Sequence, residues 1–261
     1  MARRTPWYRK LFERDYYDYF YAGGPNGSLS KEAHERQSKE QTDFIVRELE
    51  LPERARVLDL CCGWGRHAVK LARRGYRMTG LDLSTYHLRL AKAAARDAGV
   101  DVDWLHGDMR EIPGRASRFD AVINMFTSFG YFENEGEDQR VLDGIRRSLR
   151  PGGRFLIDTM NRDWLMRVFR ESDWSERPDG SFTMERRRYD IQTGRIDVDW
   201  IYVASDGKRR QQSHSLRLYT FSELGTMLSK AGLTVRGTWG GFDGSEFSMH
   251  SPRMIVLAEK G

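Results

Sequence analysis

One stretch of the sequence decides the fold, VLDLCCGWGRH at residues 57–67. It reads as a short apolar strand that ends in an acid, a turn with two glycines, and the start of a helix. Gly63 and Gly65 would let the backbone pass close under a ligand, where a Cβ would collide, and the helix start offers unpaired amides. A nicotinamide-dinucleotide site and a purely structural tight turn fit the same residues, so further elements must separate these interpretations.

Alternating strands and helices extend from this stretch toward the C-terminus. We expect strands at residues 56–60, 76–81, 102–106, 121–126 and 154–159, with helices at 66–74, 85–98 and 137–150. Two last strands, at 233–239 and 253–258, follow a helix that opens on the capping box Thr220–Glu223. Short apolar strands between helices predict a parallel sheet that is covered on both faces. The predicted fold class is therefore α/β, a doubly wound Rossmann-like sheet of seven strands with its ligand crevice at the carboxyl ends.

Two regions depart from this alternation. Residues 181–190, 195–204 and 209–219 show the two-residue periodicity of half-buried antiparallel strands, which predicts a small β insertion after strand five. Residues 7–21 are helical in pattern and rich in aromatic side chains, which suggests an N-terminal helical lid. The predicted domains are an N-terminal helical cap (1–50), a Rossmann-like core (51–162 and 220–261) and an antiparallel β insertion that covers the active site (163–219).

Composition excludes several classes of protein. With 39% hydrophobic and 31% charged residues the chain reads as globular and soluble, and it has no apolar run long enough for a membrane span. The N-terminus lacks the apolar core of a signal peptide, so we expect a cytoplasmic protein without a membrane partner. The only cysteines are the adjacent Cys61 and Cys62, a poor arrangement for a disulfide or a zinc site, and we expect no metal. Arginine runs at 146–147, 186–188 and 208–210 could bind nucleic acid, but such runs are more often solvated faces.

A second acid lies at the end of the second strand. Asp82 could accept both hydrogen bonds from a ribose diol, as acids at this position of a Rossmann-like fold do. It could instead cap the following helix, although Ser84 is at least as good a cap.

Three later elements separate the two nucleotide interpretations. After strand three, the Asp108 carboxylate could accept the adenine amino hydrogen beside Met109. After strand four, Met125 could pack on the adenine or on a methionine portion. The turn 150–153 then precedes strand five. A nicotinamide oxidoreductase leaves the Asp108 and 150–153 elements unexplained.

This ordered set resembles class I S-adenosylmethionine-dependent methyltransferases, from about residue 17 to the C-terminus. Cys61 stands where the family's first motif glycine usually occurs. The resemblance implies S-adenosyl-L-methionine as cofactor and, at the N-terminus, a tyrosine segment that closes over it. The implied cofactor contacts are Tyr17, Tyr21, Asp59, Cys61, Cys62, Gly63, Gly65, Asp82, Leu83, Asp108, Met109 and Met125.

The chain is most similar in pattern to small-molecule N-methyltransferases, namely aminosugar N,N-dimethyltransferases and, more distantly, glycine N-methyltransferase. Where some aminosugar enzymes carry a histidine proposed as a base, this chain has Tyr131, either the catalytic base or a residue that only lines the pocket. The candidate substrate contacts are Phe126, Asp158, Asn161, Arg162, Arg217 and Tyr219. Asp158, Asn161 and Arg162 could equally be loop and cap residues.

The sequence thus predicts methyl transfer from S-adenosylmethionine to a small-molecule amine or hydroxyl. An RNA methyltransferase is the alternative, and a NAD(P)-binding oxidoreductase or a cofactor-binding protein without catalysis are further ones. The sequence leaves open the acceptor, the methylated atom, the need for a base, and whether the chain is a monomer or a homodimer.

Overall fold

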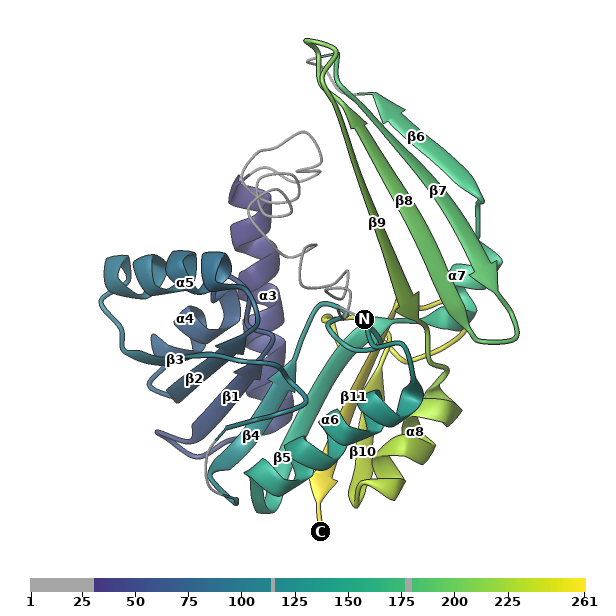
Figure 1. Ribbon diagram of the computed structural model, residues 1–261. Helices are drawn as coiled ribbons and strands as arrows, with labels where there is room; N and C mark the ends of the chain where they lie inside the picture. Colours follow the sequence, from purple (N-terminus) through teal and green to yellow (C-terminus); the bar gives the residue numbers. More distant parts are fainter. Residues whose placement is uncertain (1–30, 114–115, 177–179) are drawn as a thin grey trace, which may run out of the picture.

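The computed structural model describes residues 31–113, 116–176 and 180–261 (Figure 1). Its centre is a seven-stranded sheet, which confirms the predicted architecture. From one edge to the other the strands are β10 (Leu233–Trp239), β11 (Arg253–Lys260), β5 (Leu149–Met160), β4 (Phe119–Asn124), β1 (Arg56–Leu60), β2 (Arg77–Asp82) and β3 (Val102–His106). Strands β1 to β5 are parallel, and β11 runs antiparallel to both β5 and β10. The strand order reverses at β1 and β4, so a crevice opens at the carboxyl ends of these strands.

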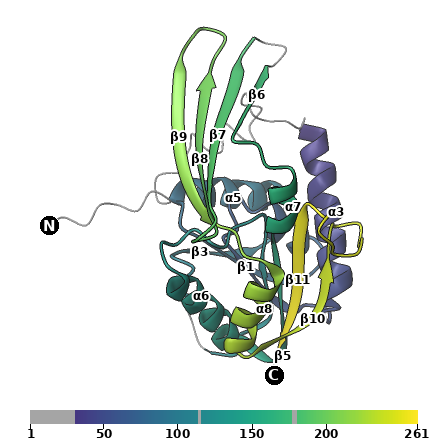
Figure 2. The same cartoon turned by 90° about the vertical axis from the view of Figure 1, so that its right-hand side faces the viewer.

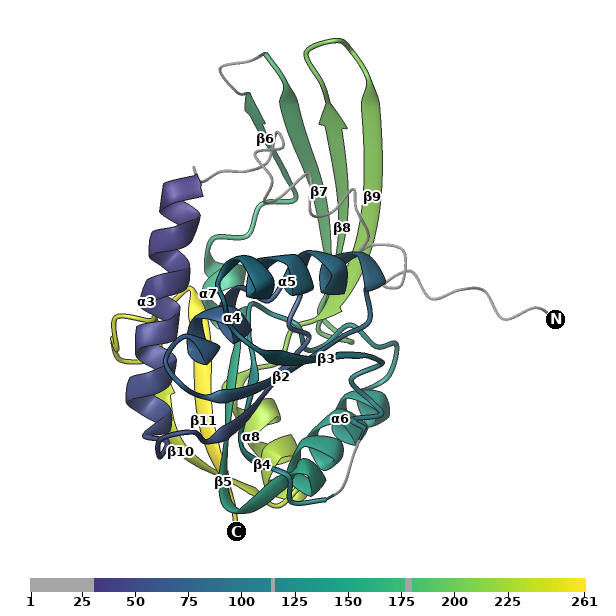
Figure 3. The ribbon, with the colours of Figure 1, turned by 90° about the vertical axis from the view of Figure 1, so that its left-hand side faces the viewer.

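Helices cover both faces of this sheet (Figure 3). On one face lie α3 (Lys31–Leu49), α4 (Arg66–Ala72) and α5 (Thr85–Asp97), and on the other lie α6 (Glu135–Ser148) and α8 (Phe221–Lys230). Phe44 and Ile45 of α3 are fully buried against the sheet, so this helix is part of the packed core. No helix within the described residues combines the length and apolarity needed to cross a membrane.

A second, four-stranded antiparallel sheet stands beyond the carboxyl ends of the main strands (Figures 1 and 2). It follows α7 (Arg162–Arg167) and contains, in order, β6 (Ser172–Glu176), β7 (Phe182–Asp190), β8 (Arg195–Val203) and β9 (Arg209–Arg217). Ile196 and Val198 on β8 are buried while Asp197 between them is exposed, as the two-residue periodicity predicted. The edge strand β6 was not predicted, because all five of its residues are exposed and show no alternation.

The small sheet is attached to the loop that follows β4. Its buried face packs on α7 and on Tyr131. Two hydrogen bonds fix the attachment: the Arg217 backbone N–H donates to the Gly130 carbonyl at 2.8 Å, and the Arg195 guanidinium donates to the Phe132 carbonyl at 2.8 Å. The loop after β4 and the small sheet therefore form one packed unit.

Two predicted boundaries were wrong. Strand four was expected to reach residue 126, but β4 ends at Asn124 because Phe126 and Thr127 adopt left-handed backbone conformations, with φ of +61° and +58°. Strand five was expected to begin at residue 154, but β5 begins at Leu149, which pairs with Phe119. The predicted turn at 150–153 is present as a bulge within β5: these four residues have no partner in the register, and Gly152 has a φ of +70°. The first error arises because neither Phe126 nor Thr127 is a residue type that predicts a left-handed conformation, whereas Pro151 and Gly152 do mark the bulge in β5.

Candidate active site

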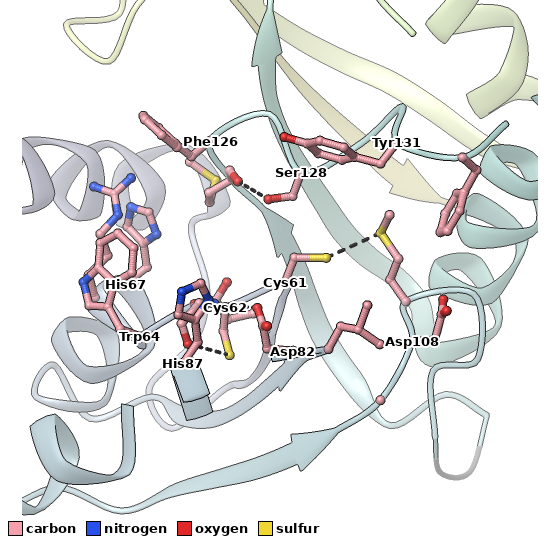
Figure 4. A pocket seen from close by; sticks show the side chains of 18 residues that line it. Cys61, Cys62, Trp64, His67, Asp82, His87, Asp108, Phe126, Ser128 and Tyr131 are labelled. Atoms are coloured by element: carbon pink, nitrogen blue, oxygen red, sulfur yellow. Dashed lines mark hydrogen bonds between the residues drawn. The ribbon is translucent and has the colours of Figure 1, made fainter. Parts of the chain in front are cut away.

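A pocket opens at the carboxyl ends of β1, β2, β3 and β4, where the sheet topology predicts a ligand site (Figure 4). One wall comes from the turn after β1 and from the ends of β2 and β3. The opposite wall is the loop after β4, with Ser128 and Tyr131 facing Asp82 and Cys62 across the space. The described lining residues are Asp59, Cys61, Cys62, Gly63, Trp64, Arg66, His67, Asp82, Leu83, His87, Gly107, Asp108, Met109, Met125, Phe126, Ser128, Tyr131 and Phe132.

The two glycines of the first turn serve different purposes. Gly63 has φ of +54°, and a Cβ added there would meet no atom within 4 Å, so the space above it is open pocket. Gly65 does not line the pocket. A Cβ on Gly65 would lie 2.6 Å from the Trp104 ring, so packing inside the protein excludes a side chain there. The predicted close approach to a ligand thus suits Gly63, while Gly65 is needed by the fold.

Cys61 occupies the position of the missing motif glycine and has a φ of +64°. Such a conformation is uncommon for a residue with a side chain, which explains why glycine usually stands there. Its Sγ lies 3.4 Å from the sulfur of Met109. Burial raises the pKa of the Cys61 thiol well above its ordinary value, so the side chain is a neutral contact of the pocket wall.

Asp59 is a buried carboxyl at the end of β1. Its Oδ2 atom has no hydrogen-bond partner among the described residues. Burial raises the pKa of Asp59 to about 7, an effect that the Arg66 guanidinium opposes and the Asp82 carboxylate strengthens. A buried acid with a free oxygen in a pocket is suited to a cationic group of a ligand, which would favour its ionised form.

Asp82 is held by the backbone on both oxygens. Gly63 N–H donates to Oδ2 and Ser84 N–H donates to Oδ1, each at 2.8 Å. Ser84, not Asp82, caps α5, because its hydroxyl accepts from the His87 N–H. A carboxylate has about four acceptor directions, so the two that remain on Asp82 can receive ligand hydroxyls. Burial raises the pKa of Asp82, which the hydrogen bond from Ser84 N–H counteracts.

The end of β3 supplies Asp108 and Met109. Arg110 engages both oxygens of Asp108, with its Nε donating at 3.0 Å and a terminal nitrogen at 2.7 Å, and it also pairs with Glu137. The Arg110 guanidinium lies 4.4 Å from the centre of the Phe132 ring. Asp108 therefore reaches the pocket as part of an ion-paired cluster that joins its two walls.

Several lining residues were not predicted from the sequence, although Trp64, Arg66 and His67 lie within or directly after the glycine turn. Arg66 donates to Gln41 Oε1 at 2.7 Å, and His67 Nε2 lies 2.9 Å from the same oxygen. Because an amide oxygen only accepts, His67 carries its hydrogen on Nε2. Burial lowers the pKa of His67 well below its ordinary value, so the imidazole is neutral. The orientation of Arg66 and His67 could not be predicted because it depends on Gln41 of α3, which lies far from them in sequence.

Five candidate substrate residues do not line the pocket. Asn161 caps α7 and donates to the Ser248 and Ser251 carbonyls at 2.9 and 2.8 Å. Arg162 pairs with Glu223 at 3.5 Å. Asn161 and Arg162 therefore have structural roles at the start of α7, which the sequence had left open as an alternative to substrate binding.

The other three are also engaged within the protein. Arg217 donates to Glu135 and Glu223 at 3.0 and 2.7 Å, and the Tyr219 hydroxyl donates to Asp138 at 2.7 Å. Asp158 accepts from Arg253 at 2.7 Å and from the Phe126 N–H at 2.9 Å. Arg217 and Tyr219 were expected to reach the pocket mouth, but carboxylates of α6 and α8 hold them on the far side of the loop. Tyr17 and Tyr21, the expected lid residues, lie outside the described residues.

Comparisons with known proteins agree with this geometry. Residues 57–153 match the family model of a methyltransferase domain. YqeM of Bacillus subtilis (strain 168), provisionally named a methyltransferase, is 27% identical over 216 residues, which cover 82% of this chain and 87% of YqeM.

Two solved structures share the fold over nearly the whole chain. The CcbJ methyltransferase from Streptomyces caelestis aligns with a TM-score of 0.81 at 21% identity, covering 94% of this chain and 96% of that one. CalS10, an amino pentose methyltransferase from Micromonospora echinaspora solved with S-adenosylmethionine bound, aligns with a TM-score of 0.68 at 22% identity, covering 94% and 97%.

The described residues also fit this cofactor. The unpartnered oxygen of Asp59 suits an α-ammonium group, and the open space above Gly63 admits a ligand where a side chain would stand. The remaining acceptor directions of Asp82 suit a ribose diol. The methyltransferase-domain match, the strand order and this pocket together identify the chain as an S-adenosylmethionine-dependent methyltransferase with a class I, Rossmann-like fold.

Proposed function

We propose that this enzyme transfers a methyl group to an amine or hydroxyl of a small molecule. The observation that carries this proposal is the far wall of the pocket. Phe126, Ser128 and Tyr131 face the glycine turn, and Tyr131 also packs under the small antiparallel sheet. An acceptor between this wall and the cofactor would lie in a partly closed chamber, as small ligands do.

The residues of the near wall would hold the cofactor. We assign Asp59 and the Gly63 turn to its methionine portion, Asp82 to its ribose, and Asp108 with Met109 to its adenine. Met125 would pack against it from the far wall. The bound cofactor supplies a methyl group already activated on a sulfonium. The protein then has to orient the acceptor and exclude water.

Tyr131 and Ser128 are the polar groups of the far wall that could meet the acceptor. The Ser128 hydroxyl donates to the Met125 carbonyl at 2.9 Å, so its oxygen remains available as an acceptor. Tyr131 is our candidate for receiving the proton that a protonated amine or a hydroxyl must lose. If Tyr131 only lines the pocket, Tyr131→Phe will change the KM of the acceptor and leave the pH profile of kcat unchanged.

The arginines of the small sheet support a small acceptor rather than RNA. Arg187 forms an ion pair with Glu185, and Arg188 with Asp197 at 3.7 Å. Paired arginines attract phosphates less, because the neighbouring carboxylate opposes the field. The acceptor of the structural neighbour CalS10, an amino pentose, supports the same class for this chain.

A methyl-transfer panel tests the proposal. The protein is incubated with methyl-labelled S-adenosylmethionine and with simple amines, aminosugars, phenols and bulk RNA. We expect label transfer to at least one small compound and none to RNA at physiological salt, since RNA binding through phosphates falls steeply with salt. Robust RNA methylation with no transfer to the small compounds would replace this proposal by an RNA methyltransferase.

A further inference from the structure

The turn after β4 carries unusual backbone strain. Phe126 and Thr127 are consecutive residues with positive φ, +61° and +58°, and neither is glycine. The left-handed region is disfavoured for residues with a Cβ, and most strongly for β-branched residues such as threonine. Such conformations persist only where the surrounding structure holds them, and they cluster at functional sites.

Asp158 on β5 holds this turn at both residues. Its Oδ2 atom accepts the Phe126 N–H and its backbone carbonyl accepts the Thr127 N–H, each at 2.9 Å. The side chain is 1% exposed, so these bonds lie away from water. Hydrogen bonds to a charged, buried acceptor are stronger than neutral ones, which suits them to offset strain.

Arg253 at the start of β11 completes the arrangement. It donates from Nε to Asp158 Oδ1 at 2.7 Å and from a terminal nitrogen to Thr127 Oγ1 at 3.0 Å. One guanidinium therefore fixes both the carboxylate and the strained threonine. Neither Asp158 nor Arg253 lines the pocket among the described residues.

The strained turn directs the Phe126 ring into the pocket. Phe126 is 42% exposed although it follows a fully buried strand end, and its ring lines the far wall. The guanidinium carbons of Arg66 and Arg253 lie 5.2 and 5.9 Å from the ring centre. With an ordinary negative φ at residue 126 the chain would continue along β4 and the ring would leave this position.

We propose that Asp158 and Arg253 are positioning residues that act through this turn, and that Phe126 determines which acceptors fit. The proposal rests on the methyl transfer to a small acceptor proposed above. Asp158 then changes the affinity for the acceptor through the position of Phe126, without contacting the acceptor itself.

Asp158→Asn and Arg253→Met test the kinetic consequence. For any panel compound that is methylated, the KM should rise on the order of 10–100-fold, because the displaced Phe126 ring no longer contacts the acceptor correctly. The kcat should change less. The dissociation constant of adenosylhomocysteine, measured by calorimetry, should stay within about twofold, because all proposed cofactor contacts except Met125 lie on the near wall, away from the turn. Arg236→Met is the matched control: Arg236 on β10 pairs with Glu259 on β11 at 2.9 Å, far from the turn, and its loss should change neither constant.

A glycine rescue separates positioning from general stability. Glycine adopts a positive φ without steric cost, so Thr127→Gly should make the turn less dependent on its supports. Arg253→Met with Thr127→Gly should therefore recover most of the lost acceptor affinity. If Arg253 instead contacts the acceptor or only stabilises the fold, the second substitution will restore nothing.

A spectroscopic readout needs no acceptor at all. Trifluoromethyl-phenylalanine introduced at position 126 should give one narrow ¹⁹F resonance in the parent protein. The resonance should shift or broaden in Asp158→Asn and Arg253→Met, and return with Thr127→Gly. An unchanged resonance in both single variants overturns the positioning role. If no small compound is methylated, the proposed function fails while this resonance still decides whether the turn is held as described.

Discussion

Two glycines of one turn illustrate how single residues divide between ligand and fold. A Cβ on Gly63 would enter open pocket, whereas a Cβ on Gly65 would collide with Trp104. We predict that Gly63→Ala weakens adenosylhomocysteine binding at least tenfold (about 1.4 kcal/mol) with a modest loss of stability. Gly65→Ala should lower the free energy of unfolding by about 2–4 kcal/mol, from overpacking and from its φ of +80°. Calorimetry and urea denaturation measure the two effects.

Gly99→Ala is the control for the stability lost when a side chain is placed at a residue with a positive φ. Gly99 has a φ of +65°, and a Cβ there would meet nothing within 4 Å, but it lies after α5 and outside the pocket. Its substitution should reproduce the stability loss of Gly63→Ala without any loss of affinity. Equal affinity of Gly63→Ala and the parent protein would mean that the ligand does not pass above Gly63.

The roles of single residues were predicted well where they depend on neighbours in sequence, and poorly where they depend on partners far away in sequence. Asp59 and Asp82 were named from the acids that end two predicted strands, and Tyr131 from the family resemblance, and all three line the pocket. Arg217 was expected at the mouth because it lies on the last strand of the predicted β insertion, residues 209–219. Its partners Glu135 and Glu223 lie on other helices, and no local pattern reveals them.

Helix starts were the most predictable feature of the elements, because a cap is a local device. The capping box at the start of α8 is formed as expected: the Thr220 hydroxyl accepts the Glu223 N–H, and the Glu223 carboxylate accepts the Thr220 N–H. Thr220→Ala should lower the free energy of unfolding by about 1 kcal/mol, measured by urea denaturation. Thr226→Ala, at an exposed site inside the same helix, should be neutral or stabilising. A similar loss at both sites would contradict the cap.

Elements without periodicity were not predictable. The strand β6 is formed only because β7 offers it an edge, and α7 has just six residues and buries none of them. The end of β4 depends on Asp158, which follows it by more than thirty positions in sequence. Such boundaries are set by tertiary contacts, which local sequence propensity does not predict.

For the whole molecule, the arrangement of the main sheet followed from alternating strands and helices, while the attachment of the small sheet could not be predicted.

The stability of the whole molecule should also depend on pH. Burial raises the pKa of Asp138 to about 7, as it does for Asp59. In the unfolded chain both carboxyls ionise near pH 3.8, so between about pH 4 and 7 the folded protein keeps protons that the unfolded chain has lost.

The sign follows from this difference. The contribution of these two carboxyls to the free energy of unfolding should fall as the pH rises through this window and level off above pH 7, by on the order of 2–4 kcal/mol for each carboxyl. The buried His67 and His214, whose pKa burial lowers, contribute with the opposite sign, so the effect is read as the difference between the parent protein and a variant. Urea denaturation of the parent protein and of Asp138→Asn or Asp59→Asn at several pH values gives this difference, and the stability of the parent relative to each variant should fall between about pH 4 and 7. Asp143→Asn, on the same helix as Asp138, serves as the control. A stability difference between the parent and each variant that does not change between pH 4 and 7 would show that the replaced acid is ionised throughout.

The pocket is shared between two stretches of chain that do not interleave. Every described lining residue falls either between Asp59 and Met109 or between Met125 and Phe132. The second stretch is bound to the small sheet through Gly130 and Phe132. Under the assignment proposed above, one genetic crossover between codons 109 and 125 would exchange the wall that faces the acceptor, with its supporting sheet, and keep every proposed cofactor contact except Met125. A chimaera joined at this point would then take its acceptor from one parent and most of its cofactor contacts from the other.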